Sequence, residues 1–292
     1  MEKGRLIKHV VITPCRNEQE HLKALATSMR NQENRPDLWI IVDDNSTDDS
    51  NDIISMLSEN EPWIRITHIS DNSERKRGAH IAELFNHGLN LIDIEWFYCS
   101  KIDADMVLPE NYFTSIFSEF FQNESLGIAS GSCYYYKNNK KITEKVSKEH
   151  TRGGLKTYKK QCLDDIGGVM EVDGWDGIDN IMAQMNGWET RNFPSIEAHH
   201  RRPTGSYYNV YVGCFEAGQF SYSMRYYPPF ILARSIVRMI RRPYIFGGIM
   251  MILGYFAAIL SRRKSVGNKE AIVFLRDKQK KRLLFWKRDR KN

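Results

Sequence analysis

The feature that most constrains the fold of this chain is an alternation of short apolar runs with segments of helical periodicity over its first hundred residues. Four β-branched or aromatic runs are predicted as buried strands, at residues 9–13, 39–42, 64–69 and 94–99. Helical spacing of apolar residues lies between them, at 18–29, from about 50 onward and at 79–91. Such alternation builds parallel strand pairs through right-handed crossovers. We therefore expect an α/β fold with a mainly parallel sheet covered on both faces.

The pattern loosens in the second part of the chain. A helix is predicted at 112–121, a strand at 128–136 and an exposed turn or lid at 137–148. Glycine-rich loops follow, and 179–185 has helical character. We expect one domain over residues 1–224, with halves at 1–109 and 110–224, and a helical appendage over 225–292.

The charge distribution supports a separate appendage. The net charge is +6, but the residues from Arg225 onward hold 18 Lys and Arg against 3 Asp and Glu, whereas the first 224 hold 24 against 33. A basic appendage on an acidic body indicates a polyanionic partner, either nucleic acid or an acidic lipid surface.

The apolar content of this tail favours lipid over nucleic acid. Residues 226–240 form a basic amphipathic pattern, and 244–260 carry no charge. A bilayer span needs about 20 such residues, with about 17 as the lower limit, so this segment could span, re-enter or lie in the interface. A buried core helix is the alternative. Basic residues on both sides favour docking on the anionic cytoplasmic leaflet, and we expect no nucleic-acid partner.

Cysteine usage and the N-terminus suggest a compartment. The five cysteines are odd in number and widely scattered, unlike a disulfide framework or a zinc site. The first nine residues are basic and short, without the apolar stretch of a signal peptide. We expect a reducing, cytoplasmic compartment and, from the basic tail, a position at the inner face of a membrane.

Two carboxylates one residue apart, Asp103 and Asp105, follow the fourth predicted strand. The carboxyl edge of an α/β sheet is where ligands bind. Alternate residues of an extended chain share a face, so these carboxylates could hold one divalent cation and, through it, a diphosphate. A solvated turn would use the same residue types.

Three motifs together resemble family 2 glycosyltransferases. The first is Thr13-Pro14-Cys15-Arg16-Asn17-Glu18, the second is residues 40–48 with Asp43-Asp44, and the third is residues 101–109 with Asp103-Ala104-Asp105. The resemblance covers roughly residues 9–205 and implies a GT-A fold, with a nucleotide-binding half followed by an acceptor-binding half. It implies an enzyme that uses a nucleoside-diphosphate sugar as donor and Mg²⁺ or Mn²⁺ as cofactor.

The resemblance also assigns roles. The residues expected to contact the nucleotide sugar are Thr13, Pro14, Arg16, Glu18, Asp43, Asp44, Arg77, Asp103 and Arg202. Asp103, Asp105 and His200 are expected at the metal, with Asp105 as the more direct ligand. His199 and His200 point to opposite faces of a strand, so one at most belongs to the site. Helix capping for the second motif and a solvated charge run around Arg77 are the alternatives.

An acceptor hydroxyl must lose its proton during sugar transfer. The resemblance places the base in residues 175–180, and Asp179 is our first choice, with Asp176 in reserve. Ile178 departs from the acidic pair usual in similar enzymes, and an N-cap aspartate is the alternative reading. A base opposite the leaving group makes the transfer inverting.

We therefore expect a metal-dependent inverting glycosyltransferase with a lipid-linked or polysaccharide acceptor, acting in cell-surface glycan synthesis. A polyprenyl-phosphate glycosyltransferase is the nearest alternative. Two other classes remain, a nucleotidyltransferase and an inactive scaffold anchored by the basic tail.

Overall fold

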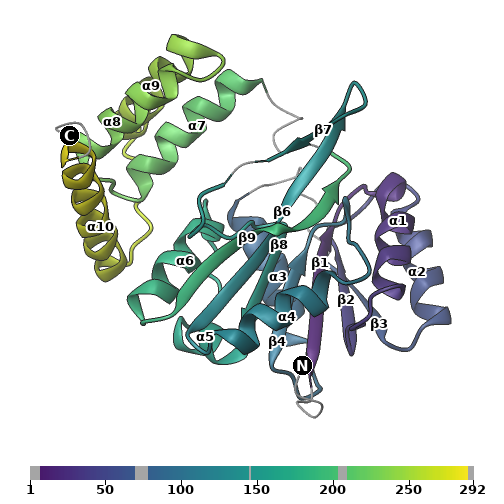
Figure 1. Ribbon diagram of the computed structural model, residues 1–292. Coiled ribbons are helices and arrows are strands. Elements are labelled where there is room, and N and C mark those ends of the chain that lie inside the picture. The colour runs from purple at the N-terminus through teal and green to yellow at the C-terminus, as the bar shows by residue number, and fades with distance from the viewer. Residues whose placement is uncertain (1–6, 70–77, 145, 203–208, 289–292) are drawn as a thin grey trace. The chain divides into compact units, whose positions relative to one another are not determined.

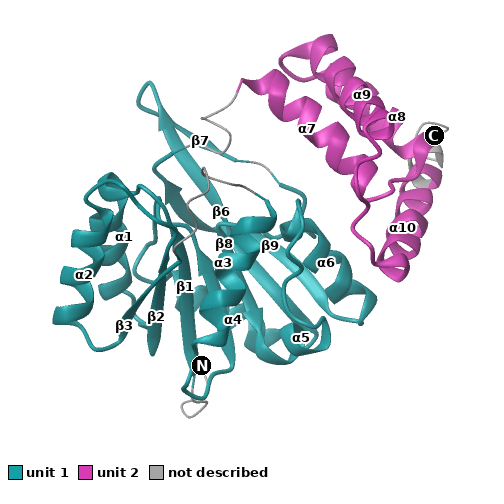
Figure 2. Cartoon of the chain, turned by 180° about the vertical axis from the view of Figure 1, so that it is seen from behind, with its two compact units in different colours: residues 1–203 teal, residues 204–292 magenta. Residues whose placement is uncertain are grey.

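The computed structural model describes residues 7–69, 78–144, 146–202 and 209–288. The chain divides into two compact units, residues 1–203 and 204–292 (Figure 2). The boundary thus lies earlier than the change in charge at Arg225 suggested. The reason is that helix α7 (Val210–Ser223) packs closely on α9 (Tyr244–Leu260), so the helical unit begins before the basic residues do.

The described part of unit 1 contains a nine-stranded sheet (Figure 1). The order is β3-β2-β1-β4-β8-β6-β9-β5, with β7 paired to β6. The strands are β1 (His9–Cys15), β2 (Leu38–Asp43), β3 (Ile64–His68), β4 (Tyr98–Ile102), β5 (Met106–Val107), β6 (Leu126–Lys137), β7 (Lys140–Thr143), β8 (Leu155–Lys159) and β9 (Glu189–His200). The first four in this order are mutually parallel, and β6 and β9 are parallel as well. The remaining pairs are antiparallel.

Helices cover both faces of the sheet, as predicted. Alternation along β1 sends Val11 into one core cluster and Val10 into the other. The first cluster includes residues of α1 (Gln19–Arg30), α2 (Ser50–Asn60) and α4 (Tyr112–Gln122). The second includes residues of α3 (Ala79–Asn90), α5 (Lys160–Asp165) and α6 (Trp175–Met185). The predicted α/β class with a doubly covered sheet is confirmed.

Three predicted boundaries were wrong. Strand β1 does not stop at Pro14 but continues to Cys15 beside β2. Its pairing with β4 ends at Ile12, so the missing N–H of Pro14 breaks no ladder on that side. Strand β4 lies over Tyr98–Ile102, later than the predicted run, and therefore ends immediately before Asp103. The predicted turn or lid at 137–148 contains β7, which forms a hairpin with β6.

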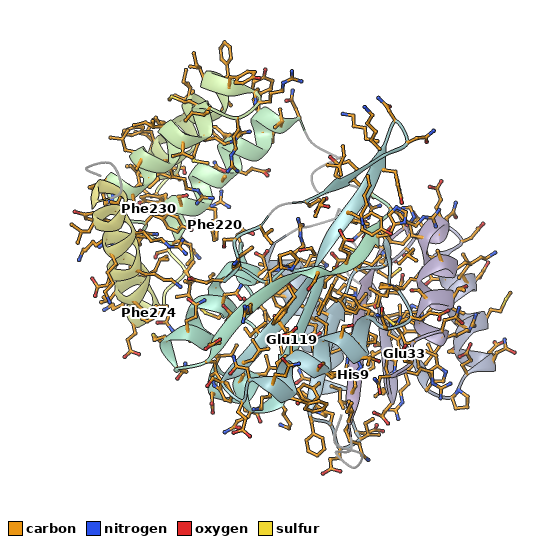
Figure 3. The ribbon with its side chains drawn as sticks, viewed as in Figure 1. His9, Glu33, Glu119, Phe220, Phe230 and Phe274 are labelled. Atoms are coloured by element: carbon orange, nitrogen blue, oxygen red, sulfur yellow. The ribbon has the colours of Figure 1, made fainter. Side chains whose placement is uncertain are left out.

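His9 fixes the start of β1 beneath α4 (Figure 3). Its ring centroid lies 4.5 Å from that of Phe113 and 5.0 Å from that of Phe117, and its Nε2 lies 2.8 Å from the Ser100 hydroxyl. Burial lowers the pKa of His9 to about 3, so the ring is neutral. This histidine is part of the core and is remote from the carboxyl edge of the sheet.

Unit 2 consists of α7, α8 (Pro228–Met239), α9 and α10 (Lys269–Arg288). Helices α7 and α9 meet at glycines: a Cβ on Gly254 would lie 1.9 Å from the Phe215 carbonyl oxygen. The ring of Tyr226 packs near two phenylalanines of this unit, with its centroid 6.4 Å from that of Phe220 and 6.0 Å from that of Phe230. Figure 3 labels both phenylalanines. Among the described residues, no helix combines the length and apolarity that a membrane span requires.

Candidate active site

A pocket of about 560 Å³ opens at the carboxyl ends of β1, β2 and β4. These three strands are adjacent and parallel, so the loops that follow them meet at one edge. The lining residues are Pro14, Cys15, Arg16, Glu18, Asp44, Ile81, Leu84, Lys101, Asp103, Ala104, Asp105 and Arg202. Seven predicted site residues are therefore brought together: Pro14, Arg16, Glu18, Asp44, Asp103, Asp105 and Arg202.

The two aspartates of the third motif have different surroundings. The Asp103 side chain is 39% exposed, and its carboxylate contacts the ammonium of buried Lys101. The Asp105 side chain is 6% exposed, and its Oδ2 lies 2.9 Å from the Arg202 guanidinium. Arg202 also binds Glu18 at 2.6 Å, which joins the first motif to the third.

Asp105 and His200 form the part of the site that suits a metal. His200 Nε2 lies 3.4 Å from Asp105 Oδ1, and that buried oxygen makes no hydrogen bond among the described residues. The carboxylate oxygen without a hydrogen bond matches the oxygen ligands that Mg²⁺ and Mn²⁺ prefer, and the imidazole nitrogen beside it favours Mn²⁺, the softer of the two. His199 points to the opposite face, where its ring stacks on Tyr134.

Electrostatics at this pair follow from its contacts. Burial raises the pKa of the Asp105 carboxyl, but His200 and Arg202 outweigh that effect and hold the pKa below its usual range. Burial lowers the pKa of His200, but the carboxylates of Asp105 and Glu144 together raise it to about 9. Without a cation the site is thus held together by a protonated histidine between two carboxylates.

The second motif supplies the other side of the pocket. Asp44 binds Arg16 at 3.2 Å and the Nε2 of His80 at 2.8 Å. Asp43 is buried and accepts a hydrogen bond from the Ser46 amide at 3.2 Å, and its second oxygen makes none within the part of the chain that the structure describes.

Two further predicted contacts, those of Thr13 and Arg77, stay predictions. The Thr13 hydroxyl accepts a hydrogen bond from the Trp39 indole at 2.9 Å. This leaves open the predicted role of Thr13, in which its backbone atoms contact the base. Arg77 lies outside the described residues.

The choice of Asp179 as base does not fit the structure. Its carboxylate is buried, lies 2.7 and 2.8 Å from the Lys156 ammonium, and accepts a hydrogen bond from the Tyr158 hydroxyl at 2.5 Å. An acceptor hydroxyl cannot reach a carboxylate that is enclosed in this way. The sequence did not reveal this because Lys156 and Tyr158 lie on β8, a strand that was not predicted.

Asp176, the reserve choice, has the required access. It lies in the first turn of α6, and its side chain is 40% exposed. Gly153 and Gly154 lie between this carboxylate and the third motif: a Cβ on Gly153 would be 3.3 Å from the Asp176 Cβ, and one on Gly154 would be 2.5 Å from Asp103 Oδ2. A side chain at Gly154 would therefore collide with Asp103, and Asp176 is not among the residues that line the pocket.

Sequence reasoning missed several residues of the site. Lys101 could have been found, because strand alternation places it on the same face as Asp103. His80 and Glu144 could not, since only tertiary folding brings α3 to Asp44 and the segment after β7 to His200.

Comparison with known proteins agrees with this geometry. A family model described as Glycosyl transferase family 2 matches residues 10–177. No protein with a curated description matches the chain.

Solved structures share the fold at low sequence identity. TarS 1-349 of S. aureus is 16% identical with a TM-score of 0.53, over 72% of this chain and 65% of that one, so this chain spans less than two thirds of its length. A mannosyltransferase from Pyrobaculum calidifontis, solved with GDP-Man and Mn²⁺, is 17% identical with a TM-score of 0.58, over 92% of this chain and 78% of that one. The GT-A fold expected from the sequence is thereby confirmed.

Proposed function

Since the chain belongs to glycosyl transferase family 2 and is a glycosyltransferase, we propose that it transfers a sugar from a nucleoside-diphosphate donor to an acceptor at a membrane. The proposed transfer depends on a metal ion and inverts the configuration of the sugar. The observation that carries the proposal is the single pocket that unites the carboxylates of Asp103 and Asp105 with the cations of Arg16, Lys101 and Arg202. Carboxylates alone would repel a diphosphate, whereas cations and a metal beside them attract it.

The residues divide the chemistry between them. Asp105 and His200, with Asp103 at the pocket wall, would hold Mg²⁺ or Mn²⁺, which supplies Lewis-acid stabilisation of the departing diphosphate. Arg202 and Lys101 add fixed positive charge at the same wall. Asp43 and Asp44, after β2, would accept hydrogen bonds from the base or ribose. Asp176 would take the proton of the acceptor hydroxyl.

Donor binding provides the test. A thermal-shift panel of nucleoside diphosphates, with and without Mn²⁺, should show stabilisation that depends on both, since a ligand raises stability in proportion to its affinity and concentration. Asp105→Ala should abolish the part of this stabilisation that depends on Mn²⁺, and it should abolish turnover. A nucleoside diphosphate as product supports the proposal, and pyrophosphate would point to a nucleotidyltransferase. A full response from Asp105→Ala would contradict the metal assignment.

Acceptor assays define the second substrate. We propose a lipid-linked or glycan acceptor of cell-surface glycan synthesis, and a lipid phosphate as acceptor would instead identify a polyprenyl-phosphate enzyme. Transfer to sugar-terminated acceptors and to lipid phosphates should therefore be measured side by side.

The surface of unit 2 supports a location at the inner face of a membrane. Sixteen of the twenty large apolar side chains that are exposed among the described residues lie in this unit. On α9 they recur at Phe246, Leu253, Phe256 and Leu260, the spacing of one helix face. No Asp or Glu occurs from residue 217 to residue 269, while basic residues precede and follow α9. An apolar face within a basic surround matches an anionic bilayer interface.

Vesicle flotation of the full chain tests this location. We expect binding to vesicles that contain phosphatidylglycerol, weaker binding to phosphatidylcholine alone, and loss at high salt. Phe246→Glu should lower partitioning by about tenfold or more, because a large apolar side chain no longer enters the interface. Met56→Glu is the matched control, since Met56 of unit 1 is equally exposed at 64%. Equal effects of the two substitutions would contradict the assignment.

A further inference from the structure

His200 lies between two carboxylates that face opposite edges of its ring. Its Nε2 is 3.4 Å from Asp105 Oδ1, and its Nδ1 is 3.4 Å from Glu144 Oε1. Both are ion-pair distances, and Nδ1 makes no hydrogen bond among the described residues. The side chains of His200 and Glu144 are 9% and 10% exposed, so solvent contributes little to the orientation of the ring. Each ring nitrogen thus has its own carboxylate partner. A cation at one nitrogen would therefore have only one of the two carboxylates beside it.

Glu144 is itself held in place. Its Oε2 lies 2.5 Å from the Arg152 guanidinium, and its backbone N–H donates to the Cys133 carbonyl at 2.8 Å. The Arg152 backbone N–H donates to the Ser130 hydroxyl at 2.9 Å. Glu144 and Arg152 are therefore both hydrogen-bonded to β6, and these contacts hold the Glu144 carboxylate in place beside the ring of His200.

We infer that Glu144 is a positioning residue that orients His200 toward the metal, an inference that rests on the proposed function. Histidines that bind metals commonly donate their other N–H to a carboxylate, which fixes the tautomer and the ring plane and strengthens the ligand. With Nδ1–H directed at Glu144, the lone pair of Nε2 is directed at Asp105. The ring then cannot rotate away from the cation between turnovers.

A direct metal site at Glu144 fits less well. The donor atoms of Cys133, Glu144 and His200 lie within 4.8 Å of one another. However, the Glu144 carboxylate already has the Arg152 guanidinium beside it, and a cation added there would meet that positive charge. Asp105, on the other edge of the ring, offers a buried oxygen that makes no hydrogen bond with any described residue.

Mn²⁺ binding tests the inference independently of turnover. The metal alone is titrated into the full chain, and the electron paramagnetic resonance signal of free Mn²⁺ gives the affinity. Glu144→Ala should weaken binding by about tenfold to a hundredfold, the range for lost partners of metal ligands. Glu144→Gln should lose less, because its amide oxygen can still accept from Nδ1–H. Glu61→Ala is the matched control, since Glu61 also pairs with an arginine, Arg30, outside the pocket.

A double-mutant cycle separates positioning from general stability. In a His200→Ala background, Glu144→Ala should change Mn²⁺ affinity less than about twofold, because there is no ring left to orient. Unchanged Mn²⁺ affinity in Glu144→Ala, or a full loss that persists without His200, would overturn the inference alone. Failure of the unsubstituted chain to bind Mn²⁺ would overturn the proposed metal dependence together with it.

Discussion

The substitution of two neighbouring aspartates by asparagine distinguishes a catalytic carboxylate from a structural one. In Asp179→Asn, the Lys156 ammonium, which is fully buried, would face a neutral amide in place of a carboxylate. Removing one partner of a buried ion pair costs about 3–5 kcal/mol. The amide oxygen still accepts a hydrogen bond, so we expect about 3 kcal/mol. For a unit of this size, that corresponds to a fall in melting temperature of about 6–12 °C.

Asp176→Asn should behave in the opposite way. Its side chain is 40% exposed, and its carboxylate lies 4.0 Å from the imidazole of His150, whose pKa is lowered by burial. The free energy of unfolding should change by no more than about 0.5 kcal/mol, as for most surface substitutions. Turnover should fall by about 10²–10⁴-fold if this carboxylate is the base.

The assay combines differential scanning fluorimetry with release of nucleoside diphosphate, measured well below both melting temperatures. We expect Asp179→Asn to be less stable yet active, and Asp176→Asn to be stable yet nearly inactive. An Asp179→Asn variant of normal stability without turnover would refute this reasoning and restore Asp179 as the base.

Three further predictions concern other parts of the molecule. Burial lowers the pKa of His80, but the carboxylates of its partners outweigh burial and raise this pKa above its usual value of 6.5. The charged histidine therefore contributes its full stabilisation below pH 6.5, and this stabilisation is lost as the pH rises through the folded-state pKa. Urea unfolding should therefore show a larger deficit for His80→Asn at pH 6 than at pH 9. Gly254→Val should destabilise unit 2 by more than about 2 kcal/mol, because the new Cβ would lie 1.9 Å from a backbone oxygen. Gly213→Val is the control and should have a smaller effect, since a Cβ at Gly213 would meet no atom of another segment within 4 Å among the described residues. Hydrogen exchange of α7 and α9 measures the stability of both variants. Lys101→Met should raise the KM for the donor by about tenfold, the effect expected from losing one charged contact to phosphate, and an unchanged KM would exclude Lys101 from donor binding.

Much of the site followed from local rules. The apolar runs located β1, β2 and β4, although β1 and β4 end later than predicted, and parallel strands place their carboxyl ends at one edge. Pro14, Arg16, Glu18, Asp44, Asp103 and Asp105 were therefore predicted together and are found together. The prediction of the catalytic base was wrong because the role of Asp179 depends on side chains from other segments of the chain. Nothing in residues 175–180 indicates that Asp179 is enclosed, because Lys156 and Tyr158 come from a strand some twenty residues earlier.

The sequence by itself determined the α/β class and the basic, apolar character of the tail, because periodicity and composition are local properties of the chain. The family followed from the resemblance of three short motifs, which are local as well. The tertiary structure decided which carboxylates are accessible and which are buried. Access and electrostatic environment depend on distant segments, as when Arg202 of the chain after β9 reaches Asp105 and Glu144 reaches His200. For the same reason the fold, and not the motif, separates Asp176, which is partly exposed, from Asp179, which pairs with a buried lysine.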